Sequence, residues 1–313
     1  MADSAGEQNY GLNIYQMLRT PRFWPSLLFV FFLRLIAHMP LRFSRGVGSF
    51  LGLLLYCINR KRRHIANVNI GLCFPQLSAR ERKRFVRNHF KLNGQGLTDA
   101  AFLAWANESR IVKKTRIIGL ERYRQYLAKK AHIILLAPHL VGTNFGASFV
   151  SRERPVLAMA KGQKDPIFNW LLEKSRTRFG GKPFGRHKGM RPVVKGIKAG
   201  IPTFYFPDED FGAEVSVFAP FFNVPAATLT TLGRLAALTE AVVIPCFAYI
   251  LPGGRGYEIV LEAPLENFPE NDLKRDAVRM NEAMENGIRR MPEQYMWTLK
   301  IFKTRPDNAP PPY

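Results

Sequence analysis

A histidine directly after an apolar run is the residue whose position best suits it for chemistry. The run Ile133–Ala137 is typical of a buried strand, Pro138 closes it, and His139 follows at once. A histidine at the carboxyl end of a buried strand is well placed to act as a general base. Asn144 lies five residues further on, after Gly142, and is predicted to fold back onto the other ring nitrogen.

An acidic cluster, Asp208, Glu209 and Asp210, follows the apolar run 201–206 in the same manner. Ligands of open α/β sheets collect outside the carboxyl ends of the strands, so both clusters are candidate sites. Three carboxylates would bind a divalent metal or orient a basic or hydroxyl-bearing partner. Each cluster also has a structural interpretation: His139 as a hydrogen-bonded loop residue, and Asp208 as a cap of the next turn.

A third cluster is basic and spans residues 161–191. Most of it is interpreted as a solvated face, but phosphate recognition would draw on it because guanidinium groups bind phosphate bidentately. Arg176 and Arg178 stand out, at the end of a predicted helix. The cluster contains Lys161, Lys164, Lys174, Arg176, Arg178, Lys182, Arg186, His187, Lys188 and Arg191.

The overall charge indicates a polyanionic partner. Among 313 residues, 46 are Lys or Arg against 24 Asp or Glu, which gives a net charge of +22. Nucleic acid, anionic lipid and an acidic carrier protein all fit that charge. The hydrophobic fraction of 47% and the 24 Phe favour a membrane surface. Because the chain has no zinc-finger spacing and no RNA-binding signature, we predict no nucleic-acid partner.

The N-terminal region is apolar and flanked by basic residues. The uncharged run 23–33 has about half the length of a spanning helix, and extension through Arg34 to Met39 gives a marginal span. A basic group, Arg60–His64, follows a second short apolar run. A single spanning helix and a helix lying in the interface both fit this pattern, as does a buried helix of a soluble protein.

The periodicity predicts an α/β fold with a mixed sheet covered by helices. Residues 1–20 are predicted to be a disordered lead-in, 21–63 a membrane-anchor region, 64–306 the main domain and 307–313 a loose tail. Residues 64–107 are predicted to form two or three helices, with a capping box at Ser78 and an interruption at 93–96. Strands are predicted at 111–119, 133–137, 154–160, 201–206, 241–249 and 257–261, the last two as an antiparallel hairpin, and helices at 120–130, 143–151, 166–178, 190–199, 230–239 and 274–290.

Ordered motifs along nearly the whole chain resemble the lipid A late (secondary) acyltransferases, Gram-negative inner-membrane enzymes that add lauroyl or myristoyl chains to a Kdo-bearing lipid A precursor. Many motifs in one order make the resemblance specific. They are T-P-R-F-W (20–24), R-R-H-I-A-N-V-N-I-G-L-C-F-P (62–75), A-P-H-L-V-G (137–142), K-D-P-I-F-N-W-L (164–171), S-R-T-R (175–178), P-D-E-D-F-G (207–212), S-V-F-A-P-F-F (216–222), P-A-A-T-L-T-T (225–231), P-E-Q-Y-M-W (292–297) and F-K-T-R-P (302–306).

The resemblance implies a glycerolipid-acyltransferase-like fold with an N-terminal apolar membrane-anchoring helix, in which 64–306 is the acyltransferase domain. It implies acyl carrier protein as donor, a lipid A precursor as acceptor, inner-membrane lipids as partners and the cytoplasmic face of the inner membrane as location. No metal and no cofactor are expected.

The family's catalytic pair is a histidine followed five residues later by an acid. His139 matches the histidine, and Asn144 departs from the acid. Asn can orient the ring but brings no charge, so the chain is expected to be a slower enzyme, one with another lipid acceptor, or an inactive membrane-binding relative. The change Asn144→Asp is therefore expected to preserve or raise the rate.

The remaining site residues also follow from the resemblance. Arg176 is expected to be a catalytic residue, and the oxyanion is expected to be stabilised either by backbone N–H groups near Gly142 or by Arg176. An apolar groove at 218–222 is expected to hold the acyl chain. The expected substrate-binding residues are Lys161, Lys164, Arg178, Asp208, Asp210, Phe218 and Phe221.

Overall fold

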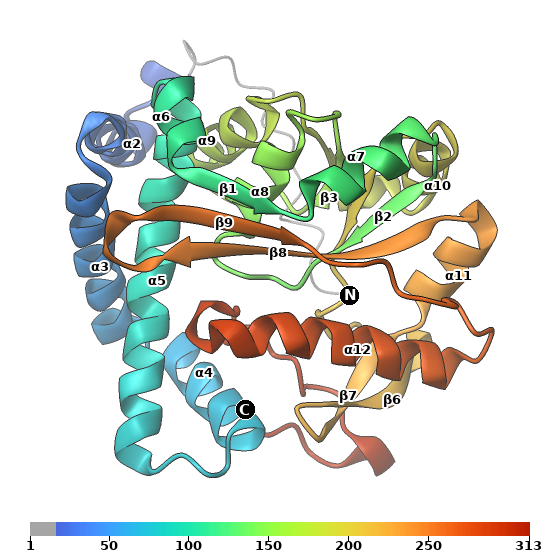
Figure 1. Cartoon of the computed structure of the whole chain (residues 1–313). Coiled ribbons are helices and arrows are strands. Elements are labelled where there is room, and N and C mark those ends of the chain that lie inside the picture. The colour runs from blue at the N-terminus through green and yellow to red at the C-terminus, as the bar shows by residue number, and fades with distance from the viewer. Residues whose placement is uncertain (1–16) are drawn as a thin grey trace.

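A computed structural model describes residues 17–313 and contains a seven-stranded mixed sheet, as predicted (Figure 1). The strand order is β1-β9-β8-β2-β5-β3-β4; β8 and β9 pair antiparallel, and the other neighbours pair parallel. The strands are β1 (Thr115–Ile118), β2 (Ile133–Leu136), β3 (Leu157–Ala160), β4 (Lys182–Gly185), β5 (Thr203–Tyr205), β8 (Val242–Leu251) and β9 (Gly256–Leu261).

Strand β2 lies in the middle of the sheet, between β8 and β5, and all four of its residues are buried. The sequence of such a strand is a continuous apolar run because helices cover both faces of the sheet. Strands β2 and β5 pair in parallel, with Leu136 opposite Tyr205. Their carboxyl ends therefore meet at one edge of the sheet, which brings the segment after β2 beside the segment after β5.

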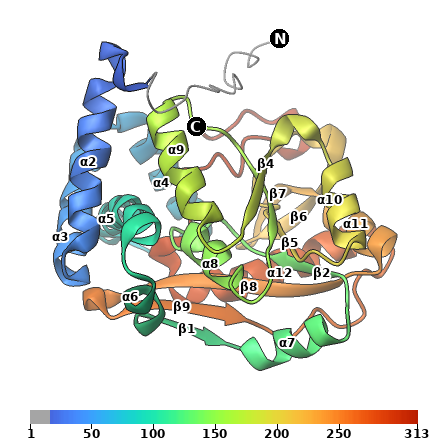
Figure 2. The same ribbon diagram turned by 90° about the horizontal axis from the view of Figure 1, so that it is seen from above.

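Helices form layers on both faces of the sheet and along one end (Figures 1 and 2). One face carries α7 (Leu120–Ala128), α8 (Thr143–Val150) and α9 (Pro166–Thr177). The other face is covered by α10 (Arg191–Lys198), α11 (Thr231–Thr239) and α12 (Leu273–Arg290), with α4 (Arg60–Cys73) nearby. At the end lie α2 (Trp24–His38), α3 (Leu41–Ile58), α5 (Ala79–Trp105) and the short α6 (Glu108–Lys113).

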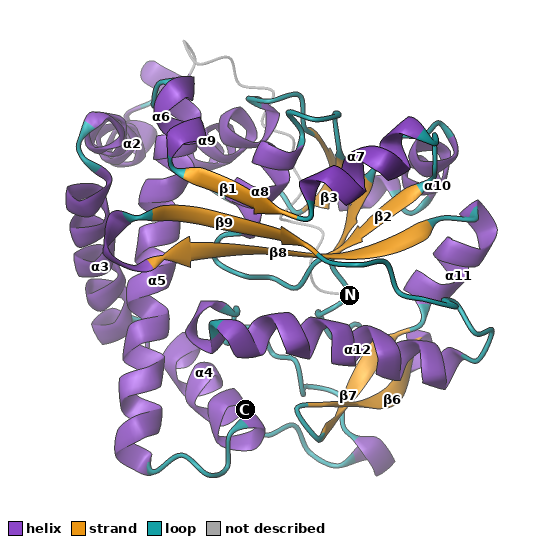
Figure 3. Cartoon of the chain, viewed as in Figure 1, coloured by secondary structure: helices purple, strands orange, loops and turns teal. Residues whose placement is uncertain are grey.

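Three strands were absent from the prediction. β4 is a short edge strand that begins with Lys182 and contains Pro183, so it lacks an apolar run. β6 (Ser216–Phe221) and β7 (Val224–Leu229) form a separate antiparallel hairpin that packs beneath α12 (Figure 3). This hairpin holds the segment in which we expected an acyl-chain groove.

Residues 64–107 lie in two helices, α4 and α5, as predicted, but α5 is continuous through the expected breakers at 93–96. The capping box at Ser78 is confirmed: its Oγ accepts from the Glu81 N–H at 3.3 Å, and the Ser78 N–H donates to Glu81 Oε2 at 2.8 Å. Gly94 does not break the helix because it serves close packing against α3. A Cβ at Gly94 would overlap Gly48 O and lie 2.7 Å from Gly52 Cα.

We expect Gly94→Ala to destabilise the fold by about 1–3 kcal/mol, because the added methyl would force α3 and α5 apart. Gly46→Ala, inside the facing helix α3, is the matched control, since a Cβ there meets nothing within 4 Å. Ala is the better helix former by about 1 kcal/mol, so the control should be neutral or stabilised. Thermal unfolding of both variants checks this, and equal stability of the two would contradict the packing argument.

The two ends of the chain differ in what the structure describes. Most of the predicted lead-in, residues 1–16, lies outside the described residues. The tail at 307–313 was expected to be loose, but its last residue is docked. The Tyr313 hydroxyl donates to Asn69 Oδ1 at 2.5 Å and accepts from the Phe302 N–H at 3.0 Å.

Candidate active site

His139 is fixed at the carboxyl end of β2 by contacts from several elements. The Ala137 N–H still donates to Tyr205 O at 3.1 Å, which extends the β2–β5 ladder up to Pro138. The His139 carbonyl accepts from the Met296 N–H at 2.9 Å. The Phe206 ring lies 5.0 Å from the imidazole, centroid to centroid. The ring is thus positioned by both the strand and the C-terminal segment.

The charged partner of His139 is Asp208, from the segment after β5. Asp208 Oδ1 lies 2.6 Å from His139 Nδ1, and Oδ2 accepts from the His139 N–H at 2.7 Å. The Asp208 side chain is 1% exposed and the His139 side chain 27%. A buried carboxylate at Nδ1 fixes the proton on that nitrogen and leaves Nε2 as the acceptor. This is the arrangement of a general base.

The five-residue spacing predicts a contact between Asn144 and the imidazole, but the structure has none. The Asn144 amide points to α9: Oδ1 accepts from Arg176 Nε at 2.9 Å, and Nδ2 donates to Ser175 Oγ at 3.1 Å. The physical reason is that Asn144 lies in the first turn of α8, whose side chains face α9. The orienting role expected of Asn144 is therefore filled by Asp208.

The pair His139–Asp208 has the electrostatics of an ion pair. Burial alone would lower the pKa of His139, but the charge and hydrogen bond of Asp208, with a further contribution from Glu209, raise that pKa above its ordinary 6.5. Burial would raise the pKa of Asp208, and the charge and hydrogen bonds of His139 outweigh it and hold that pKa below its usual range.

We expect kcat/KM to fall at acidic pH, with the midpoint of this fall above pH 6.5. A general base acts when neutral, so kcat/KM should rise with pH until the raised pKa of His139 is passed. Replacement of Asp208 by Asn removes the charge that raises this pKa, and burial then lowers it, so the midpoint should move to lower pH. The pH profile of each protein measures this. An unchanged midpoint in the Asp208 variant would show that another group titrates.

Arg176 brings a cation to the same site from the end of α9. Its side chain is half-buried, and among the described residues no carboxylate pairs with it at ion-pair distance. Burial lowers the pKa of Arg176, an effect that Glu173 partly offsets, and an arginine side chain stays charged in proteins. Asn144 holds the guanidinium by a neutral hydrogen bond, so it positions Arg176 without neutralising it.

A cavity of about 380 Å³ opens beside His139 and Arg176. One wall is apolar and comes from α8, β3 and the segment after β5. The other wall is cationic, with Glu209 as the carboxylate among its described lining residues. The apolar wall includes Ala147, Val156, Ala158, Met159 and Phe206, and the cationic wall includes Lys161, Arg176, Lys182 and Arg186.

Glu209 faces the second ring nitrogen, with its Oε1 3.8 Å from His139 Nε2. It forms a bidentate ion pair with Arg186, in which Oε2 accepts from Nη1 at 2.8 Å. Arg186 and the charge of His139 together hold the pKa of Glu209 below its usual range despite burial. The carboxylate is therefore ionised and limits the space in front of Nε2.

The remaining predicted residues lie in several different places. Lys161 lines the cavity, whereas Lys164 is exposed and makes no described contact. Arg178 donates to Leu103 O at 2.8 Å and Ala106 O at 2.6 Å, which ties α9 to the end of α5. These contacts make Arg178 a brace between helices.

Asp210 and the Phe218–Phe222 segment also have structural places. Asp210 accepts from the Thr304 N–H at 2.6 Å and the Thr304 hydroxyl at 2.7 Å, which fastens the C-terminal segment. Phe218 and Phe221 are both on β6, and Phe221 packs in the core beside Phe222 and Tyr295. Residues 218–222 do not line the cavity beside His139, so an acyl groove there stays a prediction.

The acidic cluster 208–210 is not arranged as a metal site. Its three carboxylates point to three different partners: Asp208 to His139, Glu209 to Arg186 and Asp210 to Thr304. Glu209, Arg186 and Lys182 lay in clusters that the sequence marked, but they were not selected as site residues. Strand β4 brings Lys182 and Arg186 to the cavity, and its weak apolar signal hid them.

A histidine with a buried carboxylate behind it, an arginine held by an amide and an apolar cavity suit acyl transfer to a hydroxyl or similar nucleophile. The fold supports this class, with the site at the carboxyl edge of a mostly parallel sheet. Comparison with known proteins then gives the family. The chain belongs to the bacterial lipid A biosynthesis acyltransferases, whose family profile matches residues 14–304.

Individual relatives agree with this membership. The chain is 32% identical to the lipid A biosynthesis lauroyltransferase of Escherichia coli K12 over 294 residues, which cover 94% of this chain and 96% of that protein. It is 34% identical to a lipid A biosynthesis acyltransferase of Haemophilus influenzae over 290 residues, 92% and 90% of the two chains. The E. coli lipid A biosynthesis myristoyltransferase is 32% identical over 298 residues, 94% and 92%. The predicted family is thereby confirmed.

Proposed function

We propose that this protein transfers a fatty acyl chain from acyl carrier protein to a hydroxyl of a Kdo-lipid A precursor in lipopolysaccharide biosynthesis. The observation that carries the proposal is the His139–Asp208 pair at the wall of a cavity that also holds Arg176. Membership of the family supports late acylation of lipid A.

The reaction begins with a proton transfer. His139 Nε2 removes the proton from a hydroxyl on the acceptor's 3-hydroxyacyl chain, and the imidazolium formed is stabilised by Asp208. The alkoxide attacks the carbonyl carbon of the acyl thioester and gives a tetrahedral oxyanion. Arg176 stabilises this oxyanion, because it is a cation that Asn144 holds in place and that no carboxylate of residues 17–313 pairs with. The oxyanion collapses, the C–S bond breaks, and the thiolate takes the proton from His139.

The cavity walls suit both substrates. The apolar wall would hold the part of the acyl chain next to the thioester, where each buried CH₂ contributes roughly 0.8 kcal/mol. The cationic wall, which includes Lys161 and Lys182, suits the phosphates and carboxylates of the acceptor. The surplus of positive charge on the whole chain suits the acidic carrier protein.

The test is transfer by the purified protein from a lauroyl- or myristoyl-acyl carrier protein to a Kdo-lipid A precursor, followed by mass spectrometry of the product. A mass increase of one acyl chain is expected with the carrier-bound donor. Transfer only to a lysophospholipid or another lipid would replace the acceptor, and transfer from coenzyme A alone would replace the donor. Absence of transfer in a folded, membrane-bound protein would favour the alternative of an inactive relative.

That alternative rested on Asn144, which stands in place of the family's acid. The position of Asp208 weakens it, because the charge behind the imidazole is supplied from the segment after β5. We therefore favour an active enzyme.

We also propose that the protein attaches to the cytoplasmic face of the inner membrane through α2 and α3. These two helices lie along one flank of α5 (Figures 1 and 2) and expose a row of large apolar side chains. Such a surface is typical of a membrane interface. The exposed residues are Trp24, Leu28, Phe31, Phe32 and Leu35 on α2, Met39 directly after it, and Phe43, Phe50, Leu54, Leu55 and Ile58 on α3.

The length of α2 and the contacts of α3 favour attachment in the plane of the membrane over a membrane span. α2 has 15 residues, about 22 Å, which is shorter than the hydrocarbon core. α3, Leu41–Ile58, meets the length and apolar composition of a span. However, its buried Arg45 bonds to Asp99 at 3.2 Å and to Leu251 O at 3.1 Å, which docks α3 to the body of the protein.

A further inference from the structure

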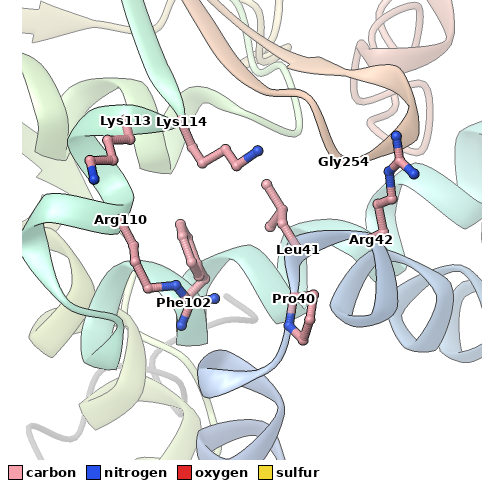
Figure 4. Close-up of a pocket in the computed structure, with 8 residues that line it drawn as sticks. All are labelled: Pro40, Leu41, Arg42, Phe102, Arg110, Lys113, Lys114 and Gly254. Atoms are coloured by element: carbon pink, nitrogen blue, oxygen red, sulfur yellow. The ribbon is translucent and has the colours of Figure 1, made fainter.

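A second cavity, of about 310 Å³, lies apart from the active site where the turn between α2 and α3 meets α5, α6 and the tip of the β8–β9 hairpin (Figure 4). Its lining combines an apolar floor with a cationic rim. The floor is formed by Pro40, Leu41, Phe102 and Gly254, and the rim by Arg42, Arg110, Lys113 and Lys114.

The four rim cations have no carboxylate partner among the described residues. In Figure 4, Lys114 extends toward Leu41 from one side, and Arg42 stands on the other side. A rim of unpaired cations around an apolar floor matches a ligand with an anionic group and an apolar part.

The backbone and two of the cations hold this cavity in shape. Arg110 donates to Met39 O at 2.8 Å and to His38 O at 3.1 Å, so its guanidinium is fixed at the end of α2. Arg42 Nε donates to Gly253 O at 3.0 Å. The hairpin tip is seated on the first turn of α3, since a Cβ at Gly254 would lie 2.7 Å from Arg42 Cγ.

The cavity adjoins the apolar face of α2 and α3. Met39 and Phe43 flank its floor in the sequence and are 44% and 55% exposed. If that face lies in the membrane interface, the rim cations lie at the level of the lipid headgroups. The floor residues then face the glycerol and upper acyl carbons of a lipid.

We propose that this cavity binds the phosphodiester headgroup of an anionic phospholipid, with Arg42, Arg110, Lys113 and Lys114 around the phosphate and Leu41 and Phe102 beneath the glycerol. The proposal rests on the interfacial attachment proposed above. It adds a specific lipid site to an otherwise nonspecific apolar contact, and this site fixes the orientation of the protein on the membrane.

The test uses the double variant Lys113→Gln/Lys114→Gln. Neither side chain makes a hydrogen bond or ion pair with the described residues, so this change leaves the fold intact. The matched control is Lys195→Gln/Lys198→Gln, two exposed lysines on α10 at the far end of the molecule from α3 (Figure 2). The probes are flotation with phosphatidylcholine vesicles, the same vesicles with phosphatidylglycerol, and the same vesicles with oleate at equal surface potential.

We expect the Lys113/Lys114 variant to bind phosphatidylglycerol vesicles about tenfold more weakly than the wild type, and the control about twofold or less. All three proteins should bind neutral vesicles equally. The wild type should prefer phosphatidylglycerol to oleate at the same surface potential, because a phosphate site distinguishes headgroups and a diffuse charge does not.

Three results would overturn the proposed lipid site while leaving the proposed acyltransferase function intact. These are equal losses in both variants, no preference between phosphatidylglycerol and oleate, and loss of inorganic-phosphate or carrier-protein binding with unchanged vesicle binding. A wild type that floats with no vesicle would overturn the interfacial attachment and the site together. Acyl transfer to a detergent-dispersed acceptor is measured in parallel and should be equal in all three proteins.

Discussion

Replacement of His139 by alanine is expected to lower kcat by about 10³- to 10⁴-fold, the contribution of a positioned general base together with its role as acid in the second half of the reaction. His139 Nε2 faces the cavity, and Nδ1 is held by Asp208, so no other described side chain offers a basic nitrogen in the same position. The measurement is the initial rate of transfer from acyl carrier protein.

Two further variants make this result specific. His139→Gln supplies Asp208 with an amide donor, so it should keep the fold near wild-type stability while remaining inactive. His64→Ala, at an exposed position on α4, should keep full activity. A His139→Ala protein that is folded and within tenfold of the wild-type rate would remove His139 from the mechanism.

The parts of the site that follow strong apolar runs could be predicted from the sequence. The runs ending at 137 and 206 placed His139 and Asp208 at the carboxyl ends of two strands, and the structure shows those strands as neighbours. The hydrophobic periodicity indicates where strands lie but does not determine the order in which they pair. Nothing local indicated that β5 pairs with β2, so the sequence pointed to the nearby Asn144 as partner when the true partner lies 69 residues away.

Other errors have the same physical origin, because local signals do not report tertiary contacts. Gly94 appears locally as a helix breaker, but its missing Cβ permits the approach of α3. The aromatic segment of β6 was expected to line a groove, yet burial beneath α12 explains its composition equally well. The membrane anchor was predicted from apolar runs, and tertiary contacts such as Arg45 with Asp99 distinguish a docked helix from a free one.

The second large effect is expected from Asp208→Asn, which should lower kcat by about 10²- to 10⁴-fold. The amide keeps the shape of the side chain but loses the charge that stabilises the imidazolium, and it can present N–H to Nδ1 and so favour the wrong tautomer. Because Asp208 is buried and bonds the ring at 2.6 Å, water does not replace the lost charge. Binding of substrate should change much less than kcat.

The double variant Asp208→Asn/Asn144→Asp decides which position carries the charge for His139. If a carboxylate at 144 can reach the imidazole, as the family spacing suggests, the double variant should recover activity. We expect no recovery, because residue 144 faces Ser175 and Arg176.

We further expect the single variant Asn144→Asp to lose about tenfold in kcat, contrary to the expectation from the sequence alone. A carboxylate there would pair with Arg176 and withdraw that cation from the oxyanion. A faster Asn144→Asp enzyme, or a restored double variant, would show that the ring changes partner during the reaction.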